Sequence, residues 1–242
     1  MAVFVTRPGP DGAKTAAALR AKGYETLVSP ALRFEPQPYQ DDETDYDAVI
    51  VTSANALRAI ADEPVLARLR KLKLFAVGGA SAEAARQHGF TRIASAEGDG
   101  ASLRDLIVRS MKKKGTLCYL AGADLSRDLV GELRERGFTV IKHVTYRMTP
   151  VGRLPDEAVA SINAQEVEAV LHYSRRSARA FLGAAQSSGV EILALALAHC
   201  CISPAVGATL HEAGASRVVV AQTPDEDAMF DALDRTLKPS PR

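Results

Sequence analysis

The sequence contains no tryptophan, and aromatic residues make up only 5% of it. Proteins that bind single-stranded nucleic acid stack the bases on aromatic side chains, so this composition argues against such a platform. The formal net charge is +1, which provides no overall attraction to nucleic acid or to an anionic membrane. We therefore expect neither nucleic acid nor membrane among the partners of this protein.

Cysteines and long apolar runs are also scarce. The cysteines are Cys118, Cys200 and Cys201, and none forms a CxxC pair, which favours a reducing, cytoplasmic compartment. The most apolar run, ILALALAHCCI, is too short to span a bilayer and is typical of a buried strand, which we place at Leu193–Ala198. Because β-forming residues begin at Val3, directly after the start, we expect no signal peptide.

Short β-rich runs alternate with helical runs rich in Ala, Leu and Arg. The predicted strands are Val3–Thr6, Glu25–Val28, Ala48–Thr52, Leu74–Val77, Thr91–Ala94, Thr116–Leu120, Thr139–Val144, Ala169–His172, Leu193–Ala198 and Arg217–Ala221. Predicted helix starts are Asp11, Ser53, Asp124 and Ser174, and glycines suited to follow a helix are Gly23, Gly89, Gly137, Gly189 and Gly214. This alternation predicts an α/β fold with parallel sheets and right-handed crossovers.

Three pairs of segments indicate an internal repeat. LRAKGYETLVSP matches LRERGFTVIKHV, DAVIVTSANALRAI matches EAVLHYSRRSARAF, and LFAVGGASAEAARQHG matches HCCISPAVGATLHEAG. General similarity between βα units could explain one match, but three in the same order favour an ancient duplication. Two polar, proline-containing segments, Pro30–Asp45 and Thr145–Pro155, interrupt the alternation and are predicted linkers.

Small and hydroxyl-bearing residues follow several predicted strands, at Thr52–Ser53, Gly78–Ser81, Gly122–Asp124 and Ser174. A parallel strand that leads into a helix places free N–H groups at the carboxyl edge of the sheet, where ligands bind. Each serine taken alone is more simply a helix cap. The repetition suits a ligand with several carboxylates or phosphates, although no GxGxxG or P-loop motif supports a nucleotide.

The order of the motifs resembles that of one enzyme family. VFVTRP, VTSANA, AVGGASAEA, SRDL, the tyrosine of HVTY, YSRRSARAF and ISP follow one another between about residues 3 and 235. This order is similar to that of the uroporphyrinogen-III synthase family. The resemblance implies two parallel-sheet α/β domains, flavodoxin-like lobes joined by a two-stranded linker, with the active site in the cleft between them. It implies a discontinuous domain 1–33 plus 150–242, an inserted domain 37–144, and linkers at about 30–45 and 145–155.

The resemblance also implies a reaction. Family members cyclise the linear tetrapyrrole hydroxymethylbilane to uroporphyrinogen III, with inversion of the last ring and loss of water, without a metal or an organic cofactor. Tyr146 matches the family tyrosine that faces the cleft, where a phenol can donate a proton to the departing hydroxyl; its alternative role is packing in the linker. The expected substrate-binding residues are Arg7, Thr52, Ser53, Asn55, Gly78, Gly79, Ser81, Gly122, Arg127, Ser174, Arg175 and Ser203.

Val206 departs from the family pattern, which has a hydroxyl residue at this position. This departure leaves open a homologue with weakened catalysis. A two-lobed, non-enzymatic ligand binder is a second alternative, against which the missing signal peptide argues. A signalling receiver domain is excluded, because Arg7–Pro8 and Thr52–Ser53 stand where it needs acidic residues. We expect a cytoplasmic monomer that binds hydroxymethylbilane, and the family role allows transient contact with the preceding enzyme of the pathway.

Overall fold

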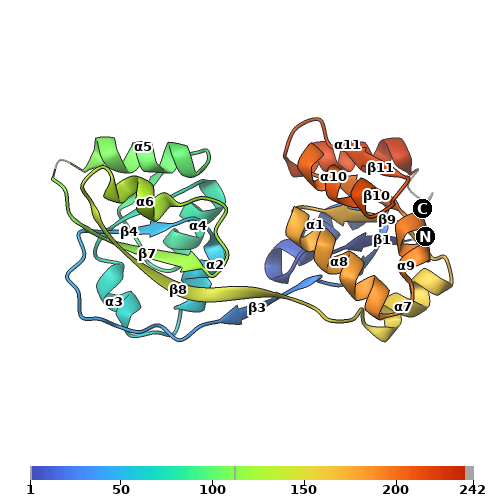
Figure 1. Ribbon diagram of the computed structural model, residues 1–242, viewed down its shortest axis with the longest axis horizontal. Coiled ribbons are helices and arrows are strands. Elements are labelled where there is room, and N and C mark those ends of the chain that lie inside the picture. Colours follow the sequence, from blue (N-terminus) through green and yellow to red (C-terminus); the bar gives the residue numbers. More distant parts are fainter. Residues whose placement is uncertain (1, 112, 238–242) are drawn as a thin grey trace. The chain divides into compact units, whose positions relative to one another are not determined.

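The computed structural model describes residues 2–111 and 113–237, and the chain divides into two compact units (Figure 1). Unit 1 consists of Met1–Phe34 and Thr149–Arg242, and unit 2 consists of Glu35–Met148. Each unit has its own sheet, with helices packed on both faces. The predicted α/β fold is therefore confirmed. No helix in the described part of the chain is long and apolar enough to cross a membrane.

Unit 1 is built on a five-stranded sheet in the order β11-β10-β9-β1-β2, in which neighbouring strands are parallel. Its strands are β1 (Ala2–Val5), β2 (Glu25–Val28), β9 (Val167–His172), β10 (Ala198–Cys201) and β11 (Val218–Val220). Its helices are α1 (Gly9–Ala21), α7 (Asp156–Asn163), α8 (Arg175–Ser187), α9 (Glu191–Ala196), α10 (Pro204–Glu212) and α11 (Glu226–Thr236). In β1, Val3 and Val5 pack toward α1 and α11. Phe4 instead meets Phe181 of α8 edge to face, with ring centroids 5.3 Å apart.

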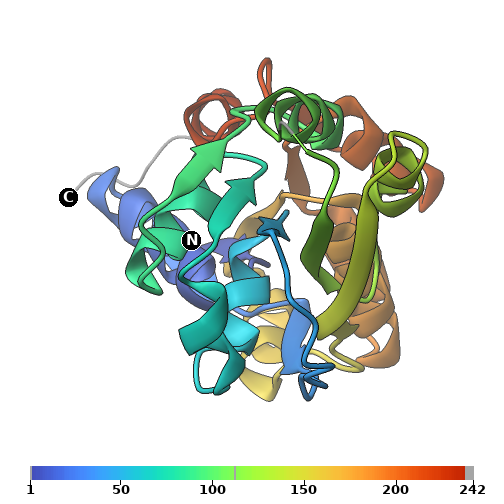
Figure 2. The ribbon, with the colours of Figure 1, turned by 90° about the vertical axis from the view of Figure 1, so that its left-hand side faces the viewer.

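Unit 2 has a six-stranded sheet in the order β3-β8-β7-β4-β5-β6, in which β8, β7, β4, β5 and β6 are parallel. Its strands are β3 (Leu32–Pro36), β4 (Ala48–Val51), β5 (Lys73–Ala76), β6 (Ile93–Ser95), β7 (Thr116–Gly122) and β8 (Thr139–Pro150). Its helices are α2 (Ala54–Ala59), α3 (Val65–Leu69), α4 (Gly79–Gln87), α5 (Gly100–Ser110) and α6 (Leu129–Arg134). Helices α2, α3 and α4 cover one face, and α5 and α6 cover the other, as Figure 2 shows.

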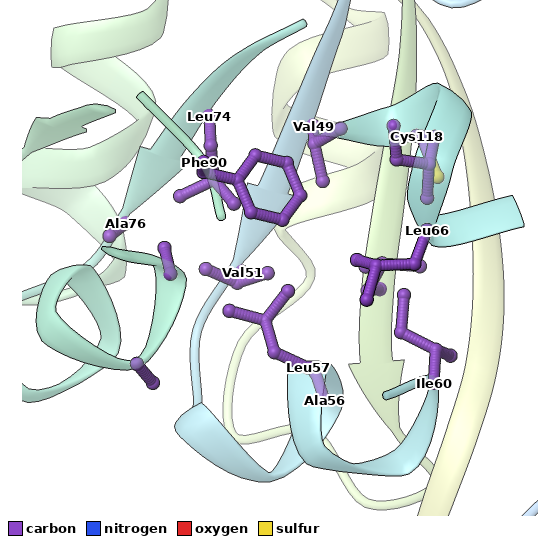
Figure 3. Close-up of a cluster of buried hydrophobic side chains, with 14 of the residues drawn as sticks. Val49, Val51, Ala56, Leu57, Ile60, Leu66, Leu74, Ala76, Phe90 and Cys118 are labelled. Atoms are coloured by element: carbon purple, nitrogen blue, oxygen red, sulfur yellow. The ribbon is translucent and has the colours of Figure 1, made fainter. Parts of the chain in front are cut away.

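The fully apolar strand β4 fits this double covering. Val49 and Val51 pack against α2, α3 and α4, whereas Ala48 and Ile50 pack against α5 and α6. The first of these cores is drawn in Figure 3, where Leu57, Leu66 and Phe90 surround the two valines. Alternate residues of one strand therefore supply both cores.

The two sheets share one strand order. In unit 1, β2 and β1 lie on one side of the sheet and β9, β10 and β11 follow; in unit 2, β8 and β7 are followed by β4, β5 and β6. Numbered along the chain, this arrangement is the flavodoxin-like order 2-1-3-4-5 in unit 1, whereas in unit 2 β7 and β8 come last instead of first, which gives 3-2-1-4-5. The direction of winding reverses between β1 and β9 and between β7 and β4. Ligands of such sheets bind at the carboxyl ends of the strands beside this reversal. The fold thus places one candidate site in each unit.

One strand prediction is wrong. Helix α9 occupies most of Leu193–Ala198, and β10 begins only at Ala198. Ala and Leu are strong helix formers, and periodicity alone does not separate a short buried strand from a helix. Ile192 is 84% exposed, which shows that this apolar run turns one side toward solvent.

The predicted linkers contain regular structure. Strand β3 lies within 30–45, and β8 continues to Pro150, well into 145–155. The boundaries between the units fall inside these two strands, which are neighbours in the sheet. Strand β3, LRFEP, carries only a short alternation of apolar and charged residues beside several prolines, which is a weak strand signal.

Most of the predicted helix ends agree with the structure. Ser53 and Ser174 are N-caps, and each accepts a hydrogen bond from a backbone N–H of the helix it begins. The glycines after helices all have positive φ: Gly23, Gly89, Gly137, Gly189 and Gly214. Two predicted starts are wrong, because Asp11 lies inside α1 and the N-cap of α6 is Asp128 instead of Asp124. The segment before α6 offers Asp124, Ser126 and Asp128 within about one turn, so sequence does not select among them. Helix α1 begins at Gly9, before its first capping side chain, with Pro10 in the first turn.

We expect Ile60→Val to lower the free energy of unfolding by about 0.5–1.5 kcal/mol. Ile60 is fully buried and packs with Leu57 and Leu66 (Figure 3), so removing one methyl group leaves space that its neighbours only partly fill. Urea unfolding of both proteins measures the difference. The matched change on the exposed side, Ile192→Val in α9, should have almost no effect; an equal loss in both variants would contradict the packing described here.

Two buried histidines, His172 of β9 and His199 of β10, share a hydrogen bond. Nε2 of His172 lies 3.0 Å from Nδ1 of His199, and the ring centroids are 5.2 Å apart. Burial lowers the pKa of His172 well below its usual value, and the neighbouring His199 lowers it further. Burial also lowers the pKa of His199 to about 4. Both rings are therefore neutral in the folded protein near neutral pH.

We expect the free energy of unfolding to fall as the pH drops below about 6.5. In the unfolded chain these imidazoles bind protons near that pH, whereas folded His199 stays neutral down to about 4. The unfolded state therefore gains protons first, and each histidine lowers stability by at most about 1.4 kcal/mol per pH unit in this window. Urea unfolding on either side of pH 6.5 measures the loss. The fall in the free energy of unfolding should be smaller in His172→Phe than in the wild type. It should equal the wild-type value in His211→Gln, which alters an exposed histidine.

Candidate active site

A hollow of about 500 Å³ lies in unit 2 at the carboxyl ends of β4 and β7, beside the reversal of strand order. Its lining comes from the ends of several strands and from the loops that follow them. The lining residues are Thr52, Ser53, Val77, Asp99, Gly100, Tyr119, Gly122, Asp124, Leu125, Ser126, Arg127, Leu129 and Tyr146. Five predicted site residues therefore meet here: Thr52, Ser53, Gly122, Arg127 and Tyr146.

A β-bulge directs Tyr146 into the hollow. The register between β7 and β8 pairs Ala121 with Val144 and then Gly122 with Tyr146, so Thr145 is the extra residue. Thr145 is buried, and its hydroxyl lies 3.4 Å from the backbone carbonyl oxygens of Ala56 and Ala121. Because Thr145 has no pairing partner on β7, Tyr146 pairs with Gly122 and its side chain points toward the hollow.

Gly122 provides the space that Tyr146 occupies. A Cβ atom on Gly122 would lie 2.8 Å from Cζ and 2.9 Å from the hydroxyl oxygen of Tyr146. These separations are too short for a real contact, so the phenol lies directly against the backbone of β7 at this position. The glycine is required by close approach to the ring; it is not among the residues with positive φ.

Tyr119 is a residue of the hollow that the sequence reasoning missed. It lies on β7, is only 2% exposed, and its hydroxyl oxygen is 3.1 Å from Oγ1 of Thr52. Burial raises the pKa of Tyr119, the hydrogen bond with Thr52 lowers it, and the nearby Tyr146 raises it. The sequence feature that could have pointed to Tyr119 is its polar hydroxyl within an otherwise apolar predicted strand.

The side chains near α5 carry both signs of charge. Nε of Arg127 lies 2.7 Å from Oε1 of Glu132, and Nη2 donates to Oε2 at 3.0 Å, so its charge is already paired. Asp99 caps α5 by accepting hydrogen bonds from the backbone N–H groups of Ala101 and Ser102. These bonds, led by those from Ser102, together with Arg127 lower the pKa of Asp99. The N-terminus of α5 therefore already holds an anion from the protein itself.

The other predicted residues of unit 2, Asn55, Gly78, Gly79 and Ser81, do not line the hollow. Oγ of Ser53 accepts a hydrogen bond of 3.2 Å from the backbone N–H of Asn55, whose own side chain turns toward Met148. Gly78 is the N-cap of α4, Gly79 is its first residue, and Ser81 is buried in its first turn. Only Val77 from this corner reaches the hollow.

Four of the predicted site residues belong to unit 1: Arg7, Ser174, Arg175 and Ser203. The guanidinium of Arg7 already has partners within this unit. It lies 4.3 Å from the centre of the Tyr173 ring, and Nη1 donates to Oε1 of Glu226 at 3.2 Å. Asp11 is a second carboxylate partner at 3.3 Å. Thr15 and Tyr173 also donate to Glu226. This cluster fills the reversal point of unit 1 with internal ion pairs.

The remaining three residues of unit 1 lie at helix N-termini. Ser174 caps α8 and accepts a hydrogen bond of 3.0 Å from the backbone N–H of Ser177, and exposed Arg175 is the first residue of that helix. Ser203 is the N-cap of α10 without a side-chain hydrogen bond to the helix. Val206 is only 2% exposed and packs with Cys201 and α8, so the departure at this position supplies core packing.

Within residues 2–111 and 113–237, no group of three or more His, Cys, Asp or Glu side chains is placed to hold a metal ion. The buried cysteines lie on strands: Cys118 on β7, and Cys200 and Cys201 on β10. Burial raises the pKa of each thiol to about 12, so all three are neutral core side chains.

Comparison with known proteins extends this description. The family model described as uroporphyrinogen-III synthase HemD matches residues 13–231. The chain is similar to the solved structure of uroporphyrinogen-III synthetase from Helicobacter pylori, with a TM-score of 0.66, 20% identity, and coverage of 96% of this chain and 98% of that chain. It is also similar to a mutant uroporphyrinogen III synthase from the extremely thermophilic bacterium Thermus thermophilus, with a TM-score of 0.58, 19% identity, and coverage of 99% and 100%.

No curated protein sequence matches the chain. At such low identity the solved structures establish the fold, whereas the family model covers most of the sequence. The chain belongs to the uroporphyrinogen-III synthase family.

Proposed function

We propose that this chain binds hydroxymethylbilane at the hollow of unit 2 and converts it to uroporphyrinogen III. Uroporphyrinogen-III synthases are cyclising lyases of tetrapyrrole biosynthesis, and family membership assigns this activity to the chain. The choice of site rests on one observation: Tyr146 lies against Gly122 in a hollow beside the reversal of strand order.

We assign to Tyr146 the donation of a proton to the departing hydroxyl. Hydroxide is a poor leaving group, and a phenol that donates its proton allows the oxygen to leave as water while the pyrrole nitrogen supplies the electron pair. The phenolate regains a proton when the last ring loses one after ring closure. The protein's larger task is orientation, since attack must occur at the substituted carbon of the last ring.

The substrate carries many carboxylates, which need hydrogen-bond donors and cations. Thr52, Ser53 and Arg127 line the hollow and are proposed contacts, with Gly122 providing space. Asn55, Gly78, Gly79 and Ser81 stay proposed contacts for parts of the substrate that extend beyond the hollow. Arg127 would share its charge between the substrate and Glu132, which limits the strength of this contact.

The proposed contacts in unit 1 are Arg7, Ser174, Arg175 and Ser203. Arg175 is exposed in the first turn of α8 and has no ion pair within the described part of the chain, so it can meet a carboxylate there. Arg7 is a weaker candidate, because Glu226 and Asp11 already neutralise its guanidinium.

We also propose the finer organisation that the family resemblance implies. The division at Phe34/Glu35 and Met148/Thr149 supports a discontinuous domain 1–33 plus 150–242 and an inserted domain 37–144, with β3 and β8 as the two-stranded linker. The shared strand order supports an ancient duplication, because the repeated segments correspond to β1–α1–β2 with β7–α6–β8, and to β9–α8–β10 with β4–α2–β5. A cytoplasmic monomer and a transient contact with the preceding pathway enzyme complete the proposal.

The decisive experiment supplies freshly generated hydroxymethylbilane and separates the type I and type III isomers after oxidation. Without an enzyme the bilane closes to type I, so predominant type III product with catalytic amounts of this protein is the expected result. Type I product alone would overturn the proposal. In that case, substrate binding measured in parallel would separate a catalytically weakened homologue or a two-lobed binder from a chain that does not recognise the bilane.

A further inference from the structure

The hydroxyl pair of Thr52 and Tyr119 has an unused hydrogen-bond donor. The two oxygens are 3.1 Å apart, and in the described part of the chain neither hydroxyl has another hydrogen-bond partner. Each group has one O–H, and only one of the two can lie between the oxygens. One O–H is therefore left over, and both residues line the hollow that contains Tyr146.

The direction of donation follows from acidity. A phenol is the stronger acid, so Tyr119 is the better donor within the pair and Thr52 keeps its own proton for a ligand. A hydroxyl that accepts one hydrogen bond becomes a stronger donor of the next, since successive bonds polarise one another. Tyr119 is also held rigidly, because its ring packs with Phe75, Leu103 and Leu129 in the core beneath α5 and α6.

We propose that Tyr119 is a positioning residue that fixes and polarises the Thr52 hydroxyl, so that Thr52 donates a hydrogen bond to the same departing oxygen that Tyr146 protonates. This inference rests on the proposed function. Two donors, Thr52 directly after β4 and Tyr146 on β8, then meet at one substrate oxygen. A hydroxyl held in advance stabilises charge that develops on that oxygen as its bond to carbon breaks.

The test compares Thr52→Val, Thr52→Ser, Tyr119→Phe and the double variant Thr52→Val/Tyr119→Phe in steady-state kinetics. Removing a donor to developing charge lowers kcat on the order of a hundredfold, which we expect for Thr52→Val. Tyr119→Phe should lower kcat roughly tenfold, because it removes the one hydrogen bond that holds the Thr52 hydroxyl in place. The double variant should be no slower than Thr52→Val, since Tyr119 acts through Thr52. Thr52→Ser keeps the hydroxyl and should restore most of kcat.

A matched control is Tyr24→Phe in unit 1, which removes a phenol that donates to Asp234 outside the hollow. It should leave kcat unchanged. Wild-type kcat in Tyr119→Phe, losses that multiply in the double variant, or a raised KM with unchanged kcat would each overturn the inference. If the wild-type protein yields only type I product, the proposed function fails together with this inference. If it yields type III product, the proposed function holds and the variants test only the role of Tyr119.

Discussion

Tyr146→Phe should lower kcat by roughly a hundredfold or more, with little change in KM. Phenylalanine keeps the ring that lies against Gly122 and removes only the O–H, so substrate binding should persist while loss of the hydroxyl slows. Turnover of hydroxymethylbilane, with the type III isomer quantified separately, measures this split. The rate that remains in Tyr146→Phe measures the acceleration that comes from orienting the substrate alone.

The result has a direct control in Tyr24→Phe, which makes the same chemical change in unit 1. If Tyr146→Phe turns over at the wild-type rate, the phenol is not the proton donor and its role is packing against β7. A rise in KM without a change in kcat would instead make it a binding residue.

Gly122→Ala should reduce kcat about as strongly as Tyr146→Phe. The new methyl group would lie 2.8 Å from Cζ of Tyr146, so the phenol must move. A displacement of about 1 Å in a catalytic group can lower the rate on the order of a hundredfold. The crowding should also lower the free energy of unfolding by about 1–3 kcal/mol. Kinetics and urea unfolding of the same preparation separate the two effects.

Gly183→Ala is the matched control for this change. A Cβ atom on Gly183 would meet no heavy atom within 4 Å apart from its chain neighbours and the backbone of its own helix, α8. Alanine there should preserve activity and raise stability by up to about 1 kcal/mol. Combining Gly122→Ala with Tyr146→Phe should add little further loss of rate, because both act on the same phenol. Wild-type kcat in Gly122→Ala would contradict the close approach described here.

Departures from the sequence predictions follow a pattern. The strand prediction failed at α9, where a short apolar segment is compatible with both a helix and a strand and tertiary packing decides. The strand prediction was right for β4, because its apolar run is short, rich in β-branched residues and followed directly by Thr52–Ser53. At the hollow, Thr52 and Ser53 were predicted because they follow such a strand, whereas Tyr119 lies within a predicted strand and was not singled out.

The amino-acid sequence by itself determined the alternation of strands and helices, the helix ends at the five glycines, and the order of motifs that indicates the family. These features depend on local chemistry, on residue periodicity and on backbone freedom. Only the tertiary structure decided which residues meet. The bulge at Thr145 aims Tyr146 over Gly122, Tyr119 reaches Thr52 across neighbouring strands, and Glu226 neutralises Arg7. Each contact joins residues far apart in the chain, and their pairing depends on strand register and packing that no local pattern encodes.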